Sequence, residues 1–187
     1  VVDLPKDVQM AETTFEYPEE VSIRGYSVQE KTTSGQIDRA VKMIEEADKP
    51  LLYVGGGTIS GSASEELTEL ARRTNIPVTT TLHGLGAFPE TDSLSLNMLG
   101  MHGTWHANQA VQHCDLLIAV AARFDDRVTG KVDAWAPHAK VIHIDIDPAC
   151  ISKNIYVDCA LVGDVKNVLQ QLLPHVKEKD TDDWLNQ

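Results

Sequence analysis

Short runs of strand-forming residues that alternate with amphipathic helical segments constrain the fold of this chain more than any other feature. The runs are aliphatic or β-branched, and they fall at residues 51–54, 77–82, 116–120, 140–146 and 160–162. Such short runs are typical of strands buried on both faces, and strands that alternate with helices favour a parallel sheet. We therefore expect an α/β fold, a Rossmann-like doubly wound parallel sheet with helices on both faces.

The expected helices are marked by apolar residues spaced three or four positions apart. The first has Ser34 as its possible N-cap and ends before Pro50. Another follows the glycines of residues 55–61, and two more are expected at residues 105–113 and 165–173. Each of them lies between two of the strand-like runs or closes the series.

Stretches without a regular period divide the chain. Residues 11–34 are rich in polar residues and predict a linker between residues 1–10 and a domain of residues 35–175. Within that domain, residues 84–103 are rich in glycine and predict a connection. Residues 176–187 form an acidic tail that we expect to be frayed. The chain opens in strand-like sequence without an initiator Met, which indicates a segment of a longer polypeptide.

Composition argues against several classes of partner and site. The net charge is −12 at pH 7, which disfavours binding to nucleic acid or to an anionic membrane. No apolar stretch approaches the roughly 20 residues of a membrane span, and no secretory signal is present. The cysteines lack a CxxC spacing, so we expect reduced thiols and a cytoplasmic protein. The histidines show no metal-ligand spacing, so no metal site is expected.

The turn Gly55-Gly56-Gly57 after the first strand is the first candidate site. Glycines let the backbone approach a ligand closely, and a following helix adds N–H groups suited to a pyrophosphate. The spacing to Gly61 is GxGxxxG and not the dinucleotide GxGxxG, and residues 79–82 supply no acid to hold a ribose. A tight strand-to-helix turn without a ligand remains the alternative, and an ordinary nicotinamide site is disfavoured.

Leu-Gly-Met-His-Gly at residues 99–103 is the second candidate. A thioether between two glycines suits a flat heterocycle. A helix-entry loop with a capping histidine explains the same residues equally well.

A charged block follows the strand at residues 116–120 and contains Arg123, Asp125, Asp126 and Arg127. Ligands of open parallel sheets bind at the carboxyl ends of the strands. A guanidinium pairs bidentately with phosphate or carboxylate, and the aspartates would orient the arginines or accept hydrogen bonds from a ligand. A solvated cluster of surface charges is the alternative.

Acidic residues also end the next two strands. Asp145 stands where a carboxylate could bind a ribose or ribityl hydroxyl, and Asp164 could be an N-cap, a ligand contact or both. Asp147 precedes Pro148 and favours a cap.

Several motifs together resemble the large catalytic subunits of the acetohydroxyacid synthase (acetolactate synthase) family, in the same order and over nearly the whole chain. They are Asp-Leu-Pro-Lys-Asp at residues 3–7, Tyr-Val-Gly-Gly-Gly at 53–57, Thr-Leu-His-Gly-Leu-Gly at 81–86, Leu-Gly-Met-His-Gly at 99–103, Arg-Phe-Asp-Asp-Arg-Val-Thr-Gly at 123–130 and His-Ile-Asp-Ile-Asp-Pro at 143–148.

The resemblance implies a three-domain thiamine-diphosphate transferase of branched-chain amino-acid biosynthesis. Such an enzyme condenses pyruvate with pyruvate or 2-oxobutyrate and releases CO2. This chain would be its central, FAD-binding domain, and residues 1–10 would end a preceding pyrimidine-binding domain. The resemblance also implies a homo-oligomer, a dimer or tetramer, contacts with the other domains of the same chain, and a small regulatory subunit.

The resemblance assigns site residues by motif. Arg127 and Met101 would also bind the second 2-oxoacid, and Lys6 and Asp126 would lie at a channel where inhibitors bind. The residues that would line the FAD are Gly55, Gly56, Gly57, Thr81, Leu82, Gly100, Met101, His102, Gly103, Arg123, Asp125, Arg127, Val128, Asp145, Ile146 and Asp164.

Two departures from the family pattern matter. Ala121 stands where the family pattern has glycine, which would loosen the backbone approach to the flavin. The chain also lacks the GDG signature for diphosphate and metal, so thiamine diphosphate and Mg are not expected to bind it, and it is expected to be non-catalytic alone. The alternative is an ADP-binding or cofactor-free structural middle domain of a related thiamine-diphosphate decarboxylase.

Overall fold

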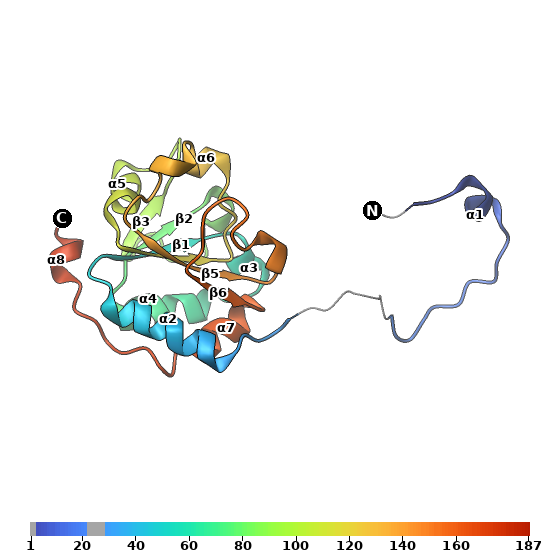
Figure 1. Cartoon of the computed structure of the whole chain (residues 1–187), viewed down its shortest axis with the longest axis horizontal. Coiled ribbons are helices and arrows are strands. Elements are labelled where there is room, and N and C mark those ends of the chain that lie inside the picture. The colour runs from blue at the N-terminus through green and yellow to red at the C-terminus, as the bar shows by residue number, and fades with distance from the viewer. Residues whose placement is uncertain (1–2, 22–28) are drawn as a thin grey trace.

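The computed structural model describes residues 3–21 and 29–187, and within them one parallel sheet forms the centre (Figure 1). Its strands run in the order β3-β2-β1-β4-β5-β6. The bounds are β1 Pro50–Val54, β2 Val78–Thr80, β3 Ser95–Met98, β4 Leu116–Val120, β5 Lys140–Asp145 and β6 Cys159–Val162. This is the doubly wound order, in which the direction of winding reverses between β1 and β4. The predicted fold class is confirmed.

Three helices cover one face of the sheet: α2 (Ser34–Glu46), α4 (Ser64–Thr74) and α7 (Val165–Leu172) (Figure 1). Alternate strand residues such as Leu52 and Ile118 point into this layer. The helices present matching apolar stripes, for example Leu67 and Leu70 on α4. Every second residue of the strands therefore packs against helix residues spaced three positions apart, and together they form one core.

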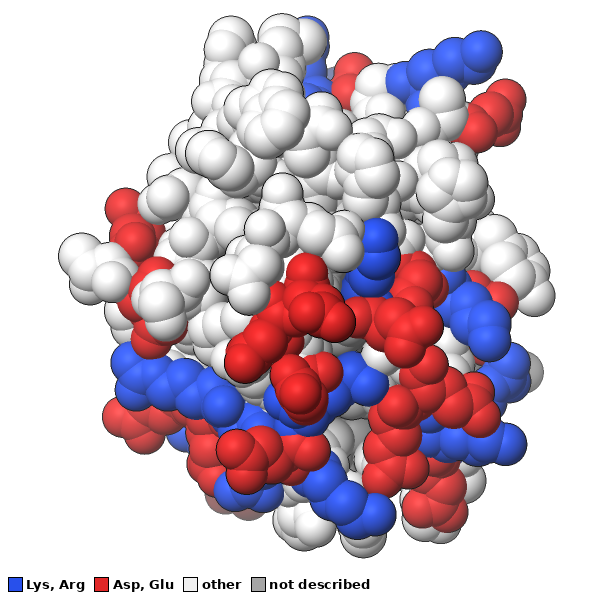
Figure 2. Space-filling model, turned by 90° about the vertical axis from the view of Figure 1, so that its left-hand side faces the viewer, with Lys and Arg blue, Asp and Glu red and all other residues white. Residues whose placement is uncertain are grey.

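The opposite face carries α5 (Trp105–His113), together with α8 (Asp182–Leu185) and a group of aromatic side chains. Tyr53, Phe124 and Trp135 contact one another with ring centroids 5.7 to 5.9 Å apart. These side chains fill the core on this side of the sheet. Figure 2 shows that charged side chains gather on the lower part of the face drawn there, whereas its upper part is mostly uncharged.

Short helical turns follow several strands and shape the loops above the sheet. They are α3 Gly57–Ser60, η1 Leu82–Gly84, α6 Asp126–Thr129, η2 Val132–Ala134 and η3 Pro148–Cys150. The expected single helix after the glycines is thus divided into α3 and α4. Leu82, expected in the second strand, belongs to η1 because the Thr81 hydroxyl accepts a hydrogen bond from the Gly84 N–H and closes a turn there.

The N-cap of α2 is Thr33 and not Ser34, because the Thr33 hydroxyl accepts from the Gln36 N–H. Just before this cap, Thr32 exchanges two hydrogen bonds with the side chain of Gln171 on α7. The end of the expected linker is therefore attached to the domain. Residues 22–28 of that linker lie outside the described residues.

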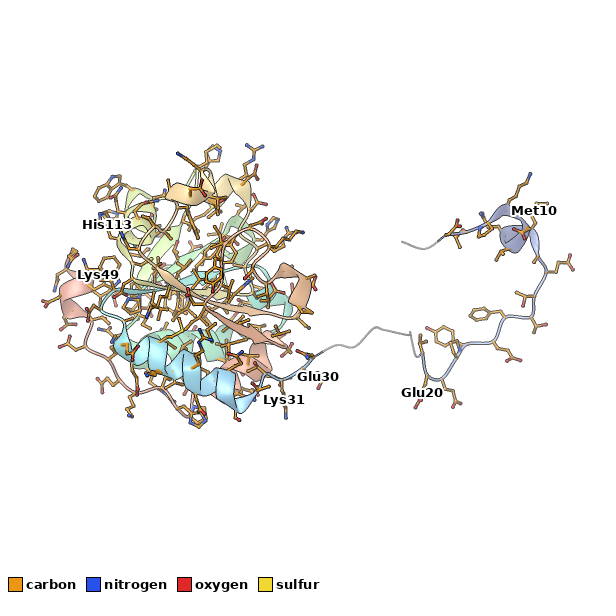
Figure 3. All side chains as sticks on the ribbon, viewed as in Figure 1. Met10, Glu20, Glu30, Lys31, Lys49 and His113 are labelled. Atoms are coloured by element: carbon orange, nitrogen blue, oxygen red, sulfur yellow. The ribbon has the colours of Figure 1, made fainter. Side chains whose placement is uncertain are left out.

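Residues 3–21 are exposed throughout, including α1 (Lys6–Met10). Figure 3 labels Met10 and Glu20 on this segment and Glu30 and Lys31 where the chain reaches α2. The division of the chain into domains at residues 10, 34 and 175 stays a prediction.

Two expectations for irregular segments are wrong. The glycine-rich connection contains the edge strand β3, which pairs with β2. The acidic tail is not frayed, because Trp184 of α8 is buried and its Nε1–H donates to the carbonyl of Pro50 at 3.0 Å. Lys49, labelled in Figure 3 beside α8, lies with its Nζ 5.4 Å from the Trp184 ring centroid.

Candidate functional site

A cavity of about 810 Å³ opens above the carboxyl ends of the strands, where the direction of winding reverses between β1 and β4. We call it the switch-point cavity. Ligands of open parallel sheets bind at this position, and the volume is typical of small-molecule sites. Its lining comprises Gly55, Gly56, Gly57, Ser60, Gly61, Thr81, Leu82, His83, Ala121, Ala122, Arg123, Asp125, Arg127, Val128, Asp145, Ile146, Cys150, Asp164 and Val165.

The glycine turn forms one wall of the cavity and packs tightly against the end of β4. The Gly55 N–H donates to the Val120 carbonyl at 2.9 Å. A Cβ at Gly55 would collide with the carbonyl oxygen of Ala121 and lie 2.5 Å from the Cα of Ala122. A Cβ at Gly57 would lie 2.7 Å from the methyl group of Ala121. The packing of the turn thus requires glycine at residues 55 and 57 even before a ligand is considered.

Ala121 continues β4 into the cavity in a left-handed conformation, with φ at +47°. Its N–H donates to the Ile144 carbonyl at 2.8 Å, which holds it in place beside β5. Glycine adopts this conformation without the steric cost that a Cβ brings. The geometry gives a physical reason for the glycine that the family pattern has at this position.

We expect Ala121→Gly to raise the free energy of unfolding by about 0.5 kcal/mol. Relief of the left-handed backbone contributes about 1–2 kcal/mol, and the greater freedom of glycine in the unfolded chain offsets part of it. Urea unfolding measures the difference. Ala119→Gly, at a buried strand position, is the control and should lose about 1 kcal/mol. Equal losses in both variants would contradict this account of Ala121.

The arginine loop, residues 121–127, forms the second wall. Asp125 is the N-cap of α6, and its Oδ1 accepts from the Arg127 N–H at 3.0 Å. This bond, the interaction with Asp126 and the nearby arginines hold the pKa of Asp125 below its usual value. Arg123 and Arg127 are exposed, line the cavity and make no ion pair within the described residues. They are therefore available to an anionic ligand.

Phe124 anchors the arginine loop and was not among the predicted site residues. Its ring is buried between Tyr53 and Trp135 on one side and His143 on the other, with centroids 5.1 to 5.7 Å away. The sequence signal that could have indicated its role is the position of an apolar residue between two charged ones. The buried ring leaves Arg123 and Asp125 directed away from the core.

Asp145 and Asp164 form the acidic end of the cavity. Asp145 Oδ1 accepts from the Asp147 N–H at 2.9 Å, and Asp164 Oδ1 accepts from the Asn167 N–H at 3.0 Å. Asp164 is therefore the N-cap of α7 as well as a cavity residue, and Asp147 caps η3 as predicted. Each cavity carboxylate keeps a second oxygen with which it can accept a hydrogen bond.

Gly100, Met101, His102 and Gly103, which were predicted to contact FAD, are not part of the cavity lining. They form the entry to α5, whose N-cap is Thr104 and not the histidine of the alternative explanation. The segment still contacts the arginine loop, because the Met101 N–H donates to the Arg127 carbonyl at 3.1 Å. The Met101 side chain is 66% exposed. Contact of these residues with a cofactor stays a prediction.

The two predicted inhibitor-channel residues also lie off the cavity lining. Asp126 is the first residue of α6 and exposed, and Lys6 is in α1 and exposed. The cavity also contains residues that were not predicted to belong to the site, among them Ser60, His83 and Cys150. Burial, Asp145 and Asp147 raise the pKa of the Cys150 thiol.

Two further properties concern metals and membranes. The described residues contain no cluster of three or more His, Cys, Asp or Glu side chains placed to hold a metal ion. Within the same residues, no helix has the length and apolar character needed to cross a membrane.

Comparison with known proteins identifies the family. Residues 37–172 match the family described as thiamine pyrophosphate enzyme, central domain. An acetolactate synthase from Mycobacterium bovis is 54% identical over 173 residues, which are 92% of this chain and 28% of that protein. The acetolactate synthase large subunit of Corynebacterium glutamicum is 50% identical over 191 residues, 100% of this chain and 30% of the relative.

The corresponding large subunit of Haemophilus influenzae is 48% identical over 181 residues, 96% of this chain and 32% of the relative. The chain thus spans about a third of the length of the curated relatives it matches. The family match covers most of the described sheet and its helices. The chain therefore belongs to the thiamine pyrophosphate enzymes and contains their central domain.

Proposed function

We propose that this chain is the FAD-binding central domain of an acetolactate synthase large subunit. The observation that carries the proposal is the switch-point cavity, which combines two arginines that form no ion pair with any described residue and two aspartates that each retain an oxygen able to accept a hydrogen bond. The similarity to acetolactate synthases supports the choice of parent enzyme. FAD would not serve there as a redox carrier in the net reaction.

The chemistry of the lining suits the parts of FAD. The pyrophosphate needs cationic donors and close backbone, for which Arg123, Arg127 and the glycine turn are the candidates. The ribose and ribityl hydroxyls need acceptors, for which Asp145 and Asp164 are the candidates. Leu82, Val128 and Ile146 add apolar surface for a flat ring.

Titration of the 187-residue chain with FAD and with ADP tests this function. We expect FAD to bind more tightly than ADP. Flavin fluorescence measures FAD binding, and calorimetry measures the binding of both nucleotides. Arg123→Ala should weaken FAD about tenfold or more, because a hydrogen bond to a charged group contributes about 1.5–3 kcal/mol. Arg39→Ala is the matched control, since Arg39 is exposed on α2 and lies outside the cavity lining.

Preference for ADP, or binding of neither nucleotide, would favour the rival function. The chain would then be an ADP-binding or cofactor-free structural middle domain of a related thiamine-diphosphate decarboxylase. An equal loss of FAD affinity in the Arg123→Ala and Arg39→Ala proteins would also count against the proposed site.

We further propose that the parent enzyme condenses pyruvate with pyruvate or 2-oxobutyrate and that Arg127 anchors the carboxylate of the second substrate, next to Met101. The Met101 N–H donates to the Arg127 carbonyl at 3.1 Å, so the two residues lie next to each other. In the full-length subunit, Arg127→Ala should change the preference between 2-oxobutyrate and pyruvate about tenfold. A product ratio equal to that of the wild type in competition assays would remove this role.

The assembly of the parent is a proposal as well. Contacts with the other domains of the chain, a homodimer or homotetramer and a small regulatory subunit are expected, and the mass of the full-length subunit in solution tests them. The described residues provide no cluster for a metal ion, so no step through Mg or thiamine diphosphate is assigned to them.

A further inference from the structure

The side chain of His143 is polar and buried beneath the switch-point cavity, and it is not part of the cavity lining. His143 lies in the middle of β5 and is fully buried. In register across the sheet, it is paired with Ala119 of β4 and Ala160 of β6, while Ala119 is paired with Tyr53 of β1 on its other side. The small alanines leave room for the imidazole ring on the aromatic face of the sheet.

The contacts of His143 lead directly to the arginine loop. Its Nε2 lies 3.0 Å from the carbonyl oxygen of Ala122, and its ring packs edge-on against Phe124 at 5.1 Å between centroids. Because a carbonyl only accepts hydrogen bonds, Nε2 must carry the proton. In a neutral ring Nδ1 is then a bare acceptor, and it is buried with no hydrogen-bond partner among residues 3–21 and 29–187. A buried, unpaired polar atom is costly and calls for an explanation.

We propose that His143 is the positioning residue of the arginine loop, holding Ala122 and Phe124 from below so that Arg123 and Arg127 face the switch-point cavity. Ala122 follows the left-handed Ala121 and directly precedes Arg123, so its carbonyl is the point at which the loop is tied to the sheet. The proposal relies on the proposed function only for the identity of the ligand.

The buried ring is expected to be neutral in the folded chain. Burial lowers the pKa of His143, although Asp145 Oδ2 at 3.6 Å from Nε2 opposes the shift. The other titratable groups on the aromatic face and the loop are Tyr53, whose phenol is buried with no hydrogen-bond partner in the described part of the chain, and Asp125, which lies close enough to act on that phenol. As the pH falls, His143 is therefore protonated at a higher pH in the unfolded chain than in the folded chain. Folding stability should decrease from about pH 7 downward, by at most about tenfold in the unfolding constant per pH unit.

Two amide variants separate the role of Nε2 from general packing. In His143→Gln, the amide nitrogen can occupy the place of Nε2 and donate to Ala122, whereas in His143→Asn it stands at the place of Nδ1, which has no partner. The N–H groups of residues 127–130 donate to Asp125 and Asp126 at the start of α6, so their hydrogen exchange reports on the loop without any ligand. The amides of α7 report on the rest of the domain.

We expect exchange at residues 127–130 to rise about tenfold in His143→Asn and to stay near the wild-type rate in His143→Gln, with α7 unchanged in both. FAD affinity should be weaker in His143→Asn and near the wild-type value in His143→Gln. The pH dependence of stability should be weaker in His143→Gln than in the wild type. If the exchange rates follow this order while neither variant nor wild type binds FAD, the proposed function fails and the positioning role stands.

Three results would overturn the positioning role. One is equal exchange in the two variants, and another is a rise shared by the loop and α7. The third needs no variant: nitrogen-15 spectra of the wild-type imidazole at pH 7 should show the neutral Nε2–H tautomer, and an Nδ1–H tautomer would refute the proposal even if both variants failed to fold.

Discussion

Gly55→Ala is expected to cost about 3 kcal/mol or more of folding stability, which is a large part of the usual 5–15 kcal/mol. The added methyl group would collide with the Ala121 carbonyl oxygen and lie 2.5 Å from the Ala122 Cα. These are backbone atoms, so no side chain can rotate away. The ends of β1 and β4 would have to separate, and the bond from the Gly55 N–H to Val120 would be strained.

Urea unfolding of the variant checks this expectation, and Gly35→Ala serves as its control. Gly35 lies near the start of α2, and a Cβ there would meet nothing within 4 Å. We expect this control to be neutral or to gain up to about 1 kcal/mol from the better helix propensity of alanine. A Gly55→Ala protein as stable as the wild type would show that the contact between the turn and the end of β4 leaves room for a methyl group.

Trp184→Ala is expected to cost about 3–5 kcal/mol, the usual loss for a buried tryptophan. The side chain is only 9% exposed, packs with the aromatic face of the sheet and donates to the Pro50 carbonyl at the beginning of β1. Its removal would also leave that carbonyl without this partner and release the Lys49 ammonium from the ring. The whole tail would then detach from the sheet.

Thermal and urea unfolding measure this loss, and Trp105→Ala is the matched control. Trp105 begins α5 and is 69% exposed, so its truncation should change the stability by about 0.5 kcal/mol or less. Limited proteolysis should cut the tail of the Trp184→Ala protein and spare that of the control. Equal stability of the two variants would indicate that the tail is frayed, as its acidic sequence predicts.

The elements with the strongest local signals were predicted well. Leu116–Val120 and Trp105–His113 have the predicted bounds, because a strand buried on both faces and a capped amphipathic helix each leave a mark in neighbouring residues. β3 was missed because Ser95–Met98 is an edge strand with only partly buried or exposed residues. Its place depends on pairing with β2, which is a contact between distant residues.

The candidate site shows the same division. Most of the predicted cofactor residues line the cavity because they directly follow strands, and a parallel sheet brings the ends of its strands to one edge. Residues 99–103 follow the edge strand and lie beside the cavity, in contact with Arg127. Cys150 lies in the lining without a motif, and His83 lies there although its motif at residues 81–86 did not assign it to the site. Only the folding of η1 and η3 over the sheet brings these two residues to the cavity.

By itself, the sequence determined the fold class, the winding of the sheet and the charged residues at its ligand edge, because these follow from short-range patterns and from the geometry of parallel strands. Only the tertiary structure decided which of those residues share a cavity, why Gly55 has no room for a methyl group, that Ala121 is left-handed, and that His143 and Phe124 support the arginine loop. These properties depend on contacts between β1, β4 and β5, whose residues are far apart along the chain and meet only when the sheet has formed.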